Sequence, residues 1–262
     1  MMNFRQNFEN GYSETNGIRL YYEIYGEGKP LVLIHGGGSS GFFDFEETIK
    51  KLHKTFRLIV IDLQNHGKSD HRDIPETFGQ DAKDIIGILE NLGIGKASFF
   101  GFSNGGTTAL EIARIFPERT EKIVAASCVT KRYGMMDGFF DALENANLEN
   151  MPQYLKNNFL KLNPDPEKFR NMFEKDRQRM ISFQDIEDTE LEKIQSPVFL
   201  ISGDRDVMKP EHIAEIKRKI PDSRMMILPA NHGNYMMADE NGNLDEKLIS
   251  FTLSQIKQFL KS

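Results

Sequence analysis

Short apolar runs that alternate with amphipathic segments are the feature that most constrains the fold of this chain. Runs of strand length are the half-exposed IRLYYEIYG at 18–26 and the continuous LVLI at 31–34, LIVI at 58–61, ASFFGF at 97–102, IVAAS at 123–127, VFLI at 198–201 and MMIL at 225–228. Continuous runs this short are typical of strands covered on both faces. Helical patterns separate them at 78–92, 107–116, 210–220 and 244–260. The order predicts an α/β fold with a mostly parallel central sheet and helices on both faces.

The stretch 133–190 breaks this alternation. It has no clear strand, and its helical patterns are interrupted by Pro152, Pro164 and Pro166. It also holds five of the 12 methionines and six of the 20 phenylalanines. These residues either form a small core of their own or line an adaptable apolar pocket. We predict an α/β core formed by 1–132 and 191–262, with a helical cap inserted at 133–190.

Polar and glycine residues follow several of the predicted strands. In an open parallel sheet, ligands bind just beyond the carboxyl ends of the strands, so these positions are the candidates for a functional site. A serine, a pair of aspartates and a histidine come together there. The positions are HGGG at 35–38, Asp62, Ser103, SGDRD at 202–206 and PANHG at 229–233.

The motif GFSNGG at 101–106 raises the question of what Ser103 does. It could cap the following helix, or it could be a nucleophile held on a strained strand-to-helix turn, as in G-x-S-x-G motifs. A strained turn needs neighbours without side chains, which Gly101 and Gly105 provide, and Gly106 allows the helix to pack close to the sheet. An aspartate and then a histidine follow at later strand ends, and this order favours the nucleophile.

The motifs LVLIHGGG, DLQNHGKSD, GFSNGG, SGDRDVMKP and NHG together resemble the α/β-hydrolase fold family, in particular its small esterases, lactonases and cofactor-free haloperoxidases. The resemblance covers nearly the whole chain. It implies that Ser103 is the nucleophile, Asp206 the triad acid and His232 the base. It also implies that the backbone N–H groups of Gly37 and Asn104 form the oxyanion hole. A serine rather than an aspartate as nucleophile argues against dehalogenase or epoxide-hydrolase chemistry.

The choice of acid and base follows from position. In relatives with a G-x-x-D turn the last aspartate belongs to the triad, which favours Asp206, and Asp204 is expected to brace the loop through its backbone. His232 follows the last predicted strand. Of the other histidines, His35 begins the oxyanion loop, where a structural role fits it better, and His66 is interpreted as a loop residue.

These assignments predict acyl transfer to Ser103 with His232 as general base and Asp206 orienting the imidazole. An apolar site under a helical cap suggests a small or medium uncharged ester or lactone as substrate. No Arg or Lys in the motifs recruits a charged one, although the cap could supply such a residue. Four apolar residues near the motifs either border the pocket or pack in the core: Phe42, Phe102, Met208 and Met236.

Other functions stay open at this stage. Perhydrolysis of the haloperoxidase type, carbon–carbon bond hydrolysis and cofactor-free lyase chemistry can use the same triad. A ligand-binding receptor with slow turnover is an alternative of another class. No cofactor or metal motif is present, and the sequence implies neither group.

Composition excludes further classes. The net charge of −6 without a basic run argues against a nucleic-acid partner, and no apolar stretch approaches membrane-spanning length. The single cysteine, Cys128, suits a reducing compartment. We therefore expect a cytoplasmic protein acting on a small molecule, with its oligomeric state left open.

Overall fold

The structure, a computed structural model, describes residues 8–262. Within them an eight-stranded sheet has the order β1-β2-β4-β3-β5-β6-β7-β8. The strands β3 to β8 are parallel, and β1 and β2 form an antiparallel edge. This confirms the predicted α/β fold. The strands are β1 Phe8–Thr15, β2 Ile18–Tyr25, β3 Lys29–Ile34, β4 Phe56–Ile61, β5 Ala97–Phe102, β6 Thr120–Ala126, β7 Val198–Arg205 and β8 Ser223–Asn231.

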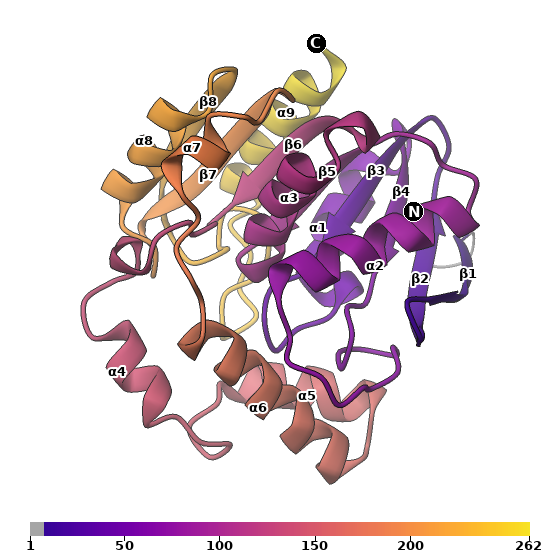
Figure 1. Cartoon of the computed structure of the whole chain (residues 1–262), viewed down its shortest axis with the longest axis vertical. Coiled ribbons are helices and arrows are strands. Elements are labelled where there is room, and N and C mark those ends of the chain that lie inside the picture. The colour runs from indigo at the N-terminus through magenta and orange to yellow at the C-terminus, as the bar shows by residue number, and fades with distance from the viewer. Residues whose placement is uncertain (1–7) are drawn as a thin grey trace.

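Helices cover both faces of the sheet (Figure 1). Side chains of α2 Phe78–Asn91, α3 Asn104–Ile115 and α8 Pro210–Lys219 pack into one apolar cluster, and those of α1 Gly41–Leu52 and α9 Glu246–Lys261 pack into another. Alternation along β3 explains the two clusters, because Val32 and Ile34 face the first while Leu31 and Leu33 face the second. The continuous apolar runs of β3 to β7 are therefore strands buried on both faces, whereas MMIL lies in the edge strand β8, where Met225 is exposed.

The segment 133–190, called the cap segment below, contains four helices and no strand. They are α4 Phe139–Glu144, α5 Gln153–Leu162, α6 Pro166–Ile181 and α7 Asp188–Leu191, and α4 to α6 lie together at one end of the sheet (Figure 1). Part of its methionine and phenylalanine content forms small clusters, one of which joins Phe159, Phe169 and Met172. That the cap segment forms a unit separate from the core remains a prediction.

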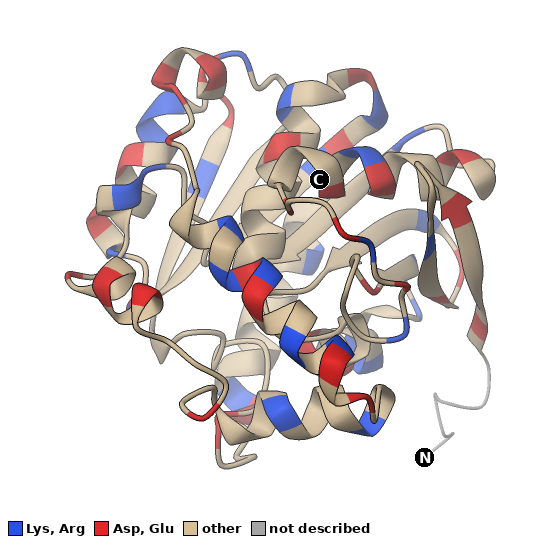
Figure 2. Ribbon diagram, turned by 60° about the horizontal axis from the view of Figure 1, so that its bottom comes forward, with Lys and Arg blue, Asp and Glu red and all other residues tan. Residues whose placement is uncertain are grey.

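The longest helix of the cap segment, α6, begins where the sequence supplies a start signal. The Asp165 side chain accepts hydrogen bonds from the backbone N–H groups of Glu167 and Lys168, and Pro166 occupies the first turn. Acidic and basic residues are interspersed over the helices of this end of the molecule (Figure 2). Among residues 8–262, none of the helices has both the length and the apolar character needed to cross a bilayer.

Candidate active site

Ser103 lies on a strained turn between β5 and α3. Its backbone has φ 54° and ψ −120°, a conformation that is costly for a residue with a side chain. A Cβ added at Gly101 would collide with the backbone of Gly105, and one at Gly105 would collide with the carbonyl oxygen of Ile34. The Ser103 hydroxyl makes no capping hydrogen bond to α3. The turn thus presents this hydroxyl instead of using it to start the helix.

The strand ends bring Ser103, His232 and Asp206 into one hydrogen-bonded series. Ser103 Oγ lies 3.2 Å from His232 Nε2, and His232 Nδ1 lies 2.6 Å from Asp206 Oδ1. Burial alone would raise the pKa of Asp206, but the hydrogen bond and charge of His232, with the Ser127 hydroxyl, lower it to about 2. A carboxylate ionised at neutral pH holds the imidazole with Nδ1 protonated and leaves Nε2 free to accept a proton.

Asp206 has further partners that the sequence did not predict. Ser127 Oγ donates to Asp206 Oδ2 at 2.5 Å and lies 2.6 Å from the hydroxyl oxygen of the fully buried Tyr235. Ser202 Oγ donates to the same Asp206 oxygen at 3.0 Å. Ser127 directly follows β6 at the carboxyl end of the sheet. This position is the signal in the sequence that could have identified it as a site residue. Asp204 accepts from the backbone N–H of Ala230 at 3.0 Å, so it bonds to the neighbouring strand β8 and not, as expected, to the backbone of its own loop.

The glycine loop after β3 is held by carboxylates on either side of Gly37. The Gly36 N–H donates to Asp44 Oδ2 at 2.8 Å, and the Gly38 N–H donates to Asp176 Oδ2 at 2.5 Å. Within residues 8–262 the N–H groups of Gly37 and Asn104 have no hydrogen-bond partner. Both residues line a cavity with Ser103, so two unpaired backbone donors stand at the predicted oxyanion positions.

His66 joins the core to the cap segment. It lies in the predicted loop, but its side chain is buried and its Nε2 is 2.8 Å from Asp176 Oδ2 on α6. Burial opposes its protonation, yet the Asp176 carboxylate raises the pKa of His66 to about 9. His35 keeps the structural role expected of it, because its Nε2 accepts from the Leu63 N–H at 3.0 Å. Nothing in the sequence links His66 to a partner more than a hundred positions away.

Arg179, also on α6, makes a second contact between the core and the cap segment. It forms ion pairs with Glu76 and, at 3.0 Å, with Asp81. All three side chains are almost completely buried. Together with His66 and Asp176 these residues form the buried ion cluster, which was not predicted from the sequence.

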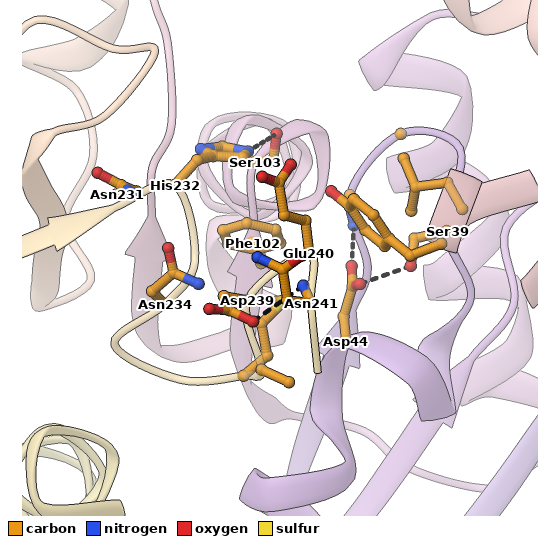
Figure 3. Close-up of a pocket in the computed structure, with 16 residues that line it drawn as sticks. Ser39, Asp44, Phe102, Ser103, Asn231, His232, Asn234, Asp239, Glu240 and Asn241 are labelled. Atoms are coloured by element: carbon orange, nitrogen blue, oxygen red, sulfur yellow. Dashed lines mark hydrogen bonds between the residues drawn. The ribbon is translucent and has the colours of Figure 1, made fainter. Parts of the chain in front are cut away.

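Two cavities of opposite character meet at Ser103 and His232. One, of about 360 Å³, lies against the cap segment and is lined largely by methionine, phenylalanine and leucine side chains. The other, of about 480 Å³, is lined by polar and acidic residues together with Phe102, Leu155 and Met237, and is drawn in Figure 3.

The predicted pocket residues fall on both sides of this arrangement. Met208 lines the apolar cavity and Phe102 lines the polar one. Phe42 lines a separate hollow beside Tyr21 and Lys68, and Met236 is completely buried in the sheet-helix core. Neither Phe42 nor Met236 is among the residues that line the two cavities at Ser103, because their side chains point into other parts of the fold.

Comparison with known proteins identifies the family. A family model of the α/β hydrolase fold matches residues 29–170, more than half of the chain. The chain belongs to this family. The human serine hydrolase BPHL is 29% identical over 252 residues, which cover 90% of this chain and 84% of BPHL.

Solved structures of α/β hydrolases share the fold. A meta-cleavage product hydrolase from Pseudomonas fluorescens IP01 superposes with a TM-score of 0.79 at 21% identity, covering 96% of this chain and 97% of that one. The enol-lactonase from Burkholderia xenovorans LB400 gives a TM-score of 0.74 at 22% identity, covering 96% of this chain and all of its own. These two α/β hydrolases are named for different substrates, so the reaction of this chain has to be argued from its own site.

Proposed function

We propose that the protein is a serine hydrolase that cleaves carboxylic esters or lactones, with Ser103 as nucleophile, His232 as base and Asp206 as acid. The observation that carries this proposal is the continuous series from Ser103 Oγ through the imidazole to Asp206, next to two unpaired backbone N–H groups. Nucleophile, base, orienting acid and anion donors are the parts that acyl transfer requires.

In this mechanism His232 Nε2 takes the Ser103 proton as the hydroxyl oxygen attacks the substrate carbonyl carbon. Asp206 keeps the imidazole in the productive tautomer and stabilises its protonated form. The N–H groups of Gly37 and Asn104 receive the developing oxyanion, each contributing about 3 kcal/mol to lowering the barrier. His232 then protonates the leaving oxygen. Water, activated by the same imidazole, hydrolyses the acyl-enzyme.

The apolar cavity suits the acyl part of such a substrate. It is lined by Met135, Phe139, Met172 and Met208 beside Ser103, and its volume of about 360 Å³ fits a small or medium chain. Flexible thioether side chains adapt to chains of different shape. Asp176 and Arg177 also line this cavity, but they are paired with His66 and Glu174 respectively. We therefore expect an acyl chain that is uncharged and apolar.

The test is labelling with a fluorophosphonate, read by intact mass and peptide mapping. The wild type should form one adduct on Ser103, Ser103→Ala should form none, and His232→Ala should react at least a hundredfold more slowly. Ser182→Ala, a change at the carboxyl end of α6, is the matched control and should label like the wild type.

Substrate panels complete this test. Hydrolysis of p-nitrophenyl butyrate and of a medium-ring lactone should vanish in Ser103→Ala. A diketone that requires carbon–carbon cleavage should be turned over more slowly than the ester by the wild type. Unchanged ester hydrolysis by pure Ser103→Ala would refute the proposal.

A further inference from the structure

The glycine loop that carries Gly37 is held from two sides, one belonging to the sheet core and the other to the cap segment. Gly37 supplies one of the two proposed oxyanion donors, and the peptide groups before and after it are each anchored by a side chain. His35 anchors the first from the core, and Asp176 anchors the second from α6. Because peptide groups are planar, the two anchors together fix where the Gly37 N–H points.

On the core side, the peptide that joins Gly36 to Gly37 is fixed by the His35 ring. Burial lowers the pKa of His35 to about 3, so the ring is neutral at pH 7. The Leu63 N–H donates to His35 Nε2 at 3.0 Å, which leaves the ring proton on Nδ1. Nδ1 lies 2.7 Å from the Gly36 carbonyl oxygen and donates to it. This half of the donor's environment is independent of the cap segment.

On the cap side, the peptide that joins Gly37 to Gly38 is fixed by Asp176. Its Oδ2 accepts from the Gly38 N–H at 2.5 Å, and a Cβ added at Gly37 would lie 3.0 Å from the same oxygen. Three consecutive glycines at 36–38 leave this loop many backbone conformations. Without an acceptor for the Gly38 N–H, we expect the second peptide to rotate and to displace Gly37.

The carboxylate that makes this contact is ionised. Burial alone would raise the pKa of Asp176, but the charge and hydrogen bond of His66, the charge of Arg179 and the Gly38 N–H lower it below its ordinary range. An unbalanced negative charge beside Gly37 would oppose the developing oxyanion. The site therefore needs a positive group next to Asp176.

His66 is that group, and its hydrogen bonds show that it is an imidazolium. Its Nδ1 lies 2.8 Å from the Gln64 carbonyl oxygen, and its Nε2 lies 2.8 Å from Asp176 Oδ2. Both oxygens can only accept, so both ring nitrogens carry a proton. The Gly38 N–H also lies 3.2 Å from His66 Nε2, but a protonated nitrogen does not accept, which leaves Asp176 as its acceptor.

We propose that Asp176 is a positioning residue for the oxyanion hole, so that the hole is complete only while the cap segment is docked on the core. This inference rests on the proposed function and extends it from the triad to the cap segment. Asp176 acts through the Gly38 peptide. A substrate in the apolar cavity contacts α6 through Met172 and Met180, so its binding favours the docked state that completes the hole.

The first test compares two replacements of Asp176 by steady-state kinetics with p-nitrophenyl butyrate. Asp176→Leu has a similar size and no acceptor, and it should lower kcat about a hundredfold with KM within about threefold, because a displaced oxyanion donor affects the transition state. Asp176→Asn keeps an oxygen that can accept from the Gly38 N–H and should lose no more than about tenfold.

Two inhibitors separate positioning from a general loss of structure. With pentyl trifluoromethyl ketone the Ser103 oxygen bonds to the carbonyl carbon, its proton passes to His232, and the carbonyl oxygen becomes an oxyanion in the hole. Pentyl methyl ketone has the same chain and binds without this addition. Asp176→Leu should weaken the first inhibitor roughly a hundredfold and the second by no more than about threefold.

Lys175→Met is the matched control on the same helix. Lys175 forms an ion pair at 2.8 Å with the exposed Asp73 of the core and is bonded to the Ile74 carbonyl oxygen, so its loss removes a contact between α6 and the core outside the glycine loop. It should leave kcat within about twofold.

A double variant covers the case in which Asp176→Leu does not fold. Asp176→Leu combined with His66→Leu removes both charges of the pair, so neither is left buried without its partner. The Gly38 N–H again lacks its acceptor, and the same loss of kcat is expected.

The outcomes separate this inference from the proposed function. A kcat within about threefold of the wild type in the folded Asp176→Leu or double variant, or equal weakening of the two ketones, would overturn the inference and leave the serine hydrolase standing. A loss in Lys175→Met as large as that in Asp176→Leu would also overturn it. No ester hydrolysis by the wild type, together with no adduct on Ser103, would refute the proposed function itself.

Discussion

The sheet core and the cap segment are positioned by different forces. In the core, Ser103 and Asp206 follow β5 and β7, whose apolar side chains are buried, and His232 follows the edge strand β8, so backbone pairing and packing place them. The cap segment meets the core through the buried ion cluster, in which Arg179 faces Glu76 and Asp81 while Asp176 faces His66. The sheet core is held by apolar packing, which changes little with pH or salt. The attachment of the cap segment depends on charge as well as on packing, since Met180 and Phe183 also join an apolar cluster with Phe78 of the core.

This difference has consequences for substitution and for pH. Removing a methylene from a packed core leaves a small cavity, whereas removing one ion from a buried cluster leaves its partners charged and unsolvated. Asp176 also holds the Gly38 N–H, so the cluster reaches the loop that carries Gly37. The cap segment is accordingly the part of the molecule in which charge changes should alter the site.

The largest expected effect is the loss of kcat when a triad residue of the sheet core is changed. Asp206→Asn removes the charge that orients His232 and should lower kcat for ester hydrolysis by about 10³ to 10⁴ without unfolding the sheet. Steady-state kinetics with p-nitrophenyl butyrate measures this, and circular dichroism checks the fold.

Asp204→Asn is the matched control for that experiment, because an amide oxygen can still accept the hydrogen bond from Ala230. It should change kcat by no more than a few-fold. Equal losses in the two variants would show that Asp206 acts by bracing the loop and not by orienting the imidazole.

The next effect concerns the docking of the cap segment. Arg179→Met leaves Glu76 and Asp81 buried without their cation and should lower the free energy of unfolding by about 3–5 kcal/mol. Urea denaturation measures the loss, and limited proteolysis should cut first within 133–190.

Arg177→Met supplies the comparison on the same helix, because Arg177 is partly exposed and pairs with Glu174. Its cost should be within about 1 kcal/mol. A loss as large as that of Arg179→Met, or first cleavage within the sheet core, would contradict docking by charge.

The smallest effect is the pH dependence of the same docking. The folded pKa of His66 is about 9, above its ordinary value near 6.5, so its pairing with Asp176 stabilises fully below pH 6.5 and is lost as pH rises through about 9. Glu76 also favours the protonated imidazole, and His35, His71 and Asp44 are further titratable groups that interact with its charge. Arg179 contacts Asp176. The loss should reach about 3 kcal/mol.

Urea denaturation at pH 6.5, 7.5 and 9 measures this slope. His66→Gln should abolish it, and His53→Gln, a partly buried histidine bonded to the Ile49 carbonyl oxygen, should keep it. A slope that survives in His66→Gln would assign the pH dependence to another group.

Local patterns predicted much of the core. The parallel strands followed from continuous apolar runs, and the meeting of Ser103, Asp206 and His232 followed from their positions at strand ends. The edge strand β1 escaped prediction because FENGYSET has no apolar run, and it is stabilised by pairing with β2. Whether Phe42 and Met236 border the pocket could not be predicted, because distance along the chain does not give the direction of a side chain.

The amino-acid sequence by itself determined the α/β fold, the strained turn at Ser103 and the order of the acid and base, since each depends on short-range pattern. Only the tertiary structure decided the pairing of His66 with Asp176, the burial of Arg179 and the two cavities that meet at Ser103. Charged residues look alike in a sequence whether water or another ion solvates them. Which of the two does so depends on distant segments that meet only in the folded chain.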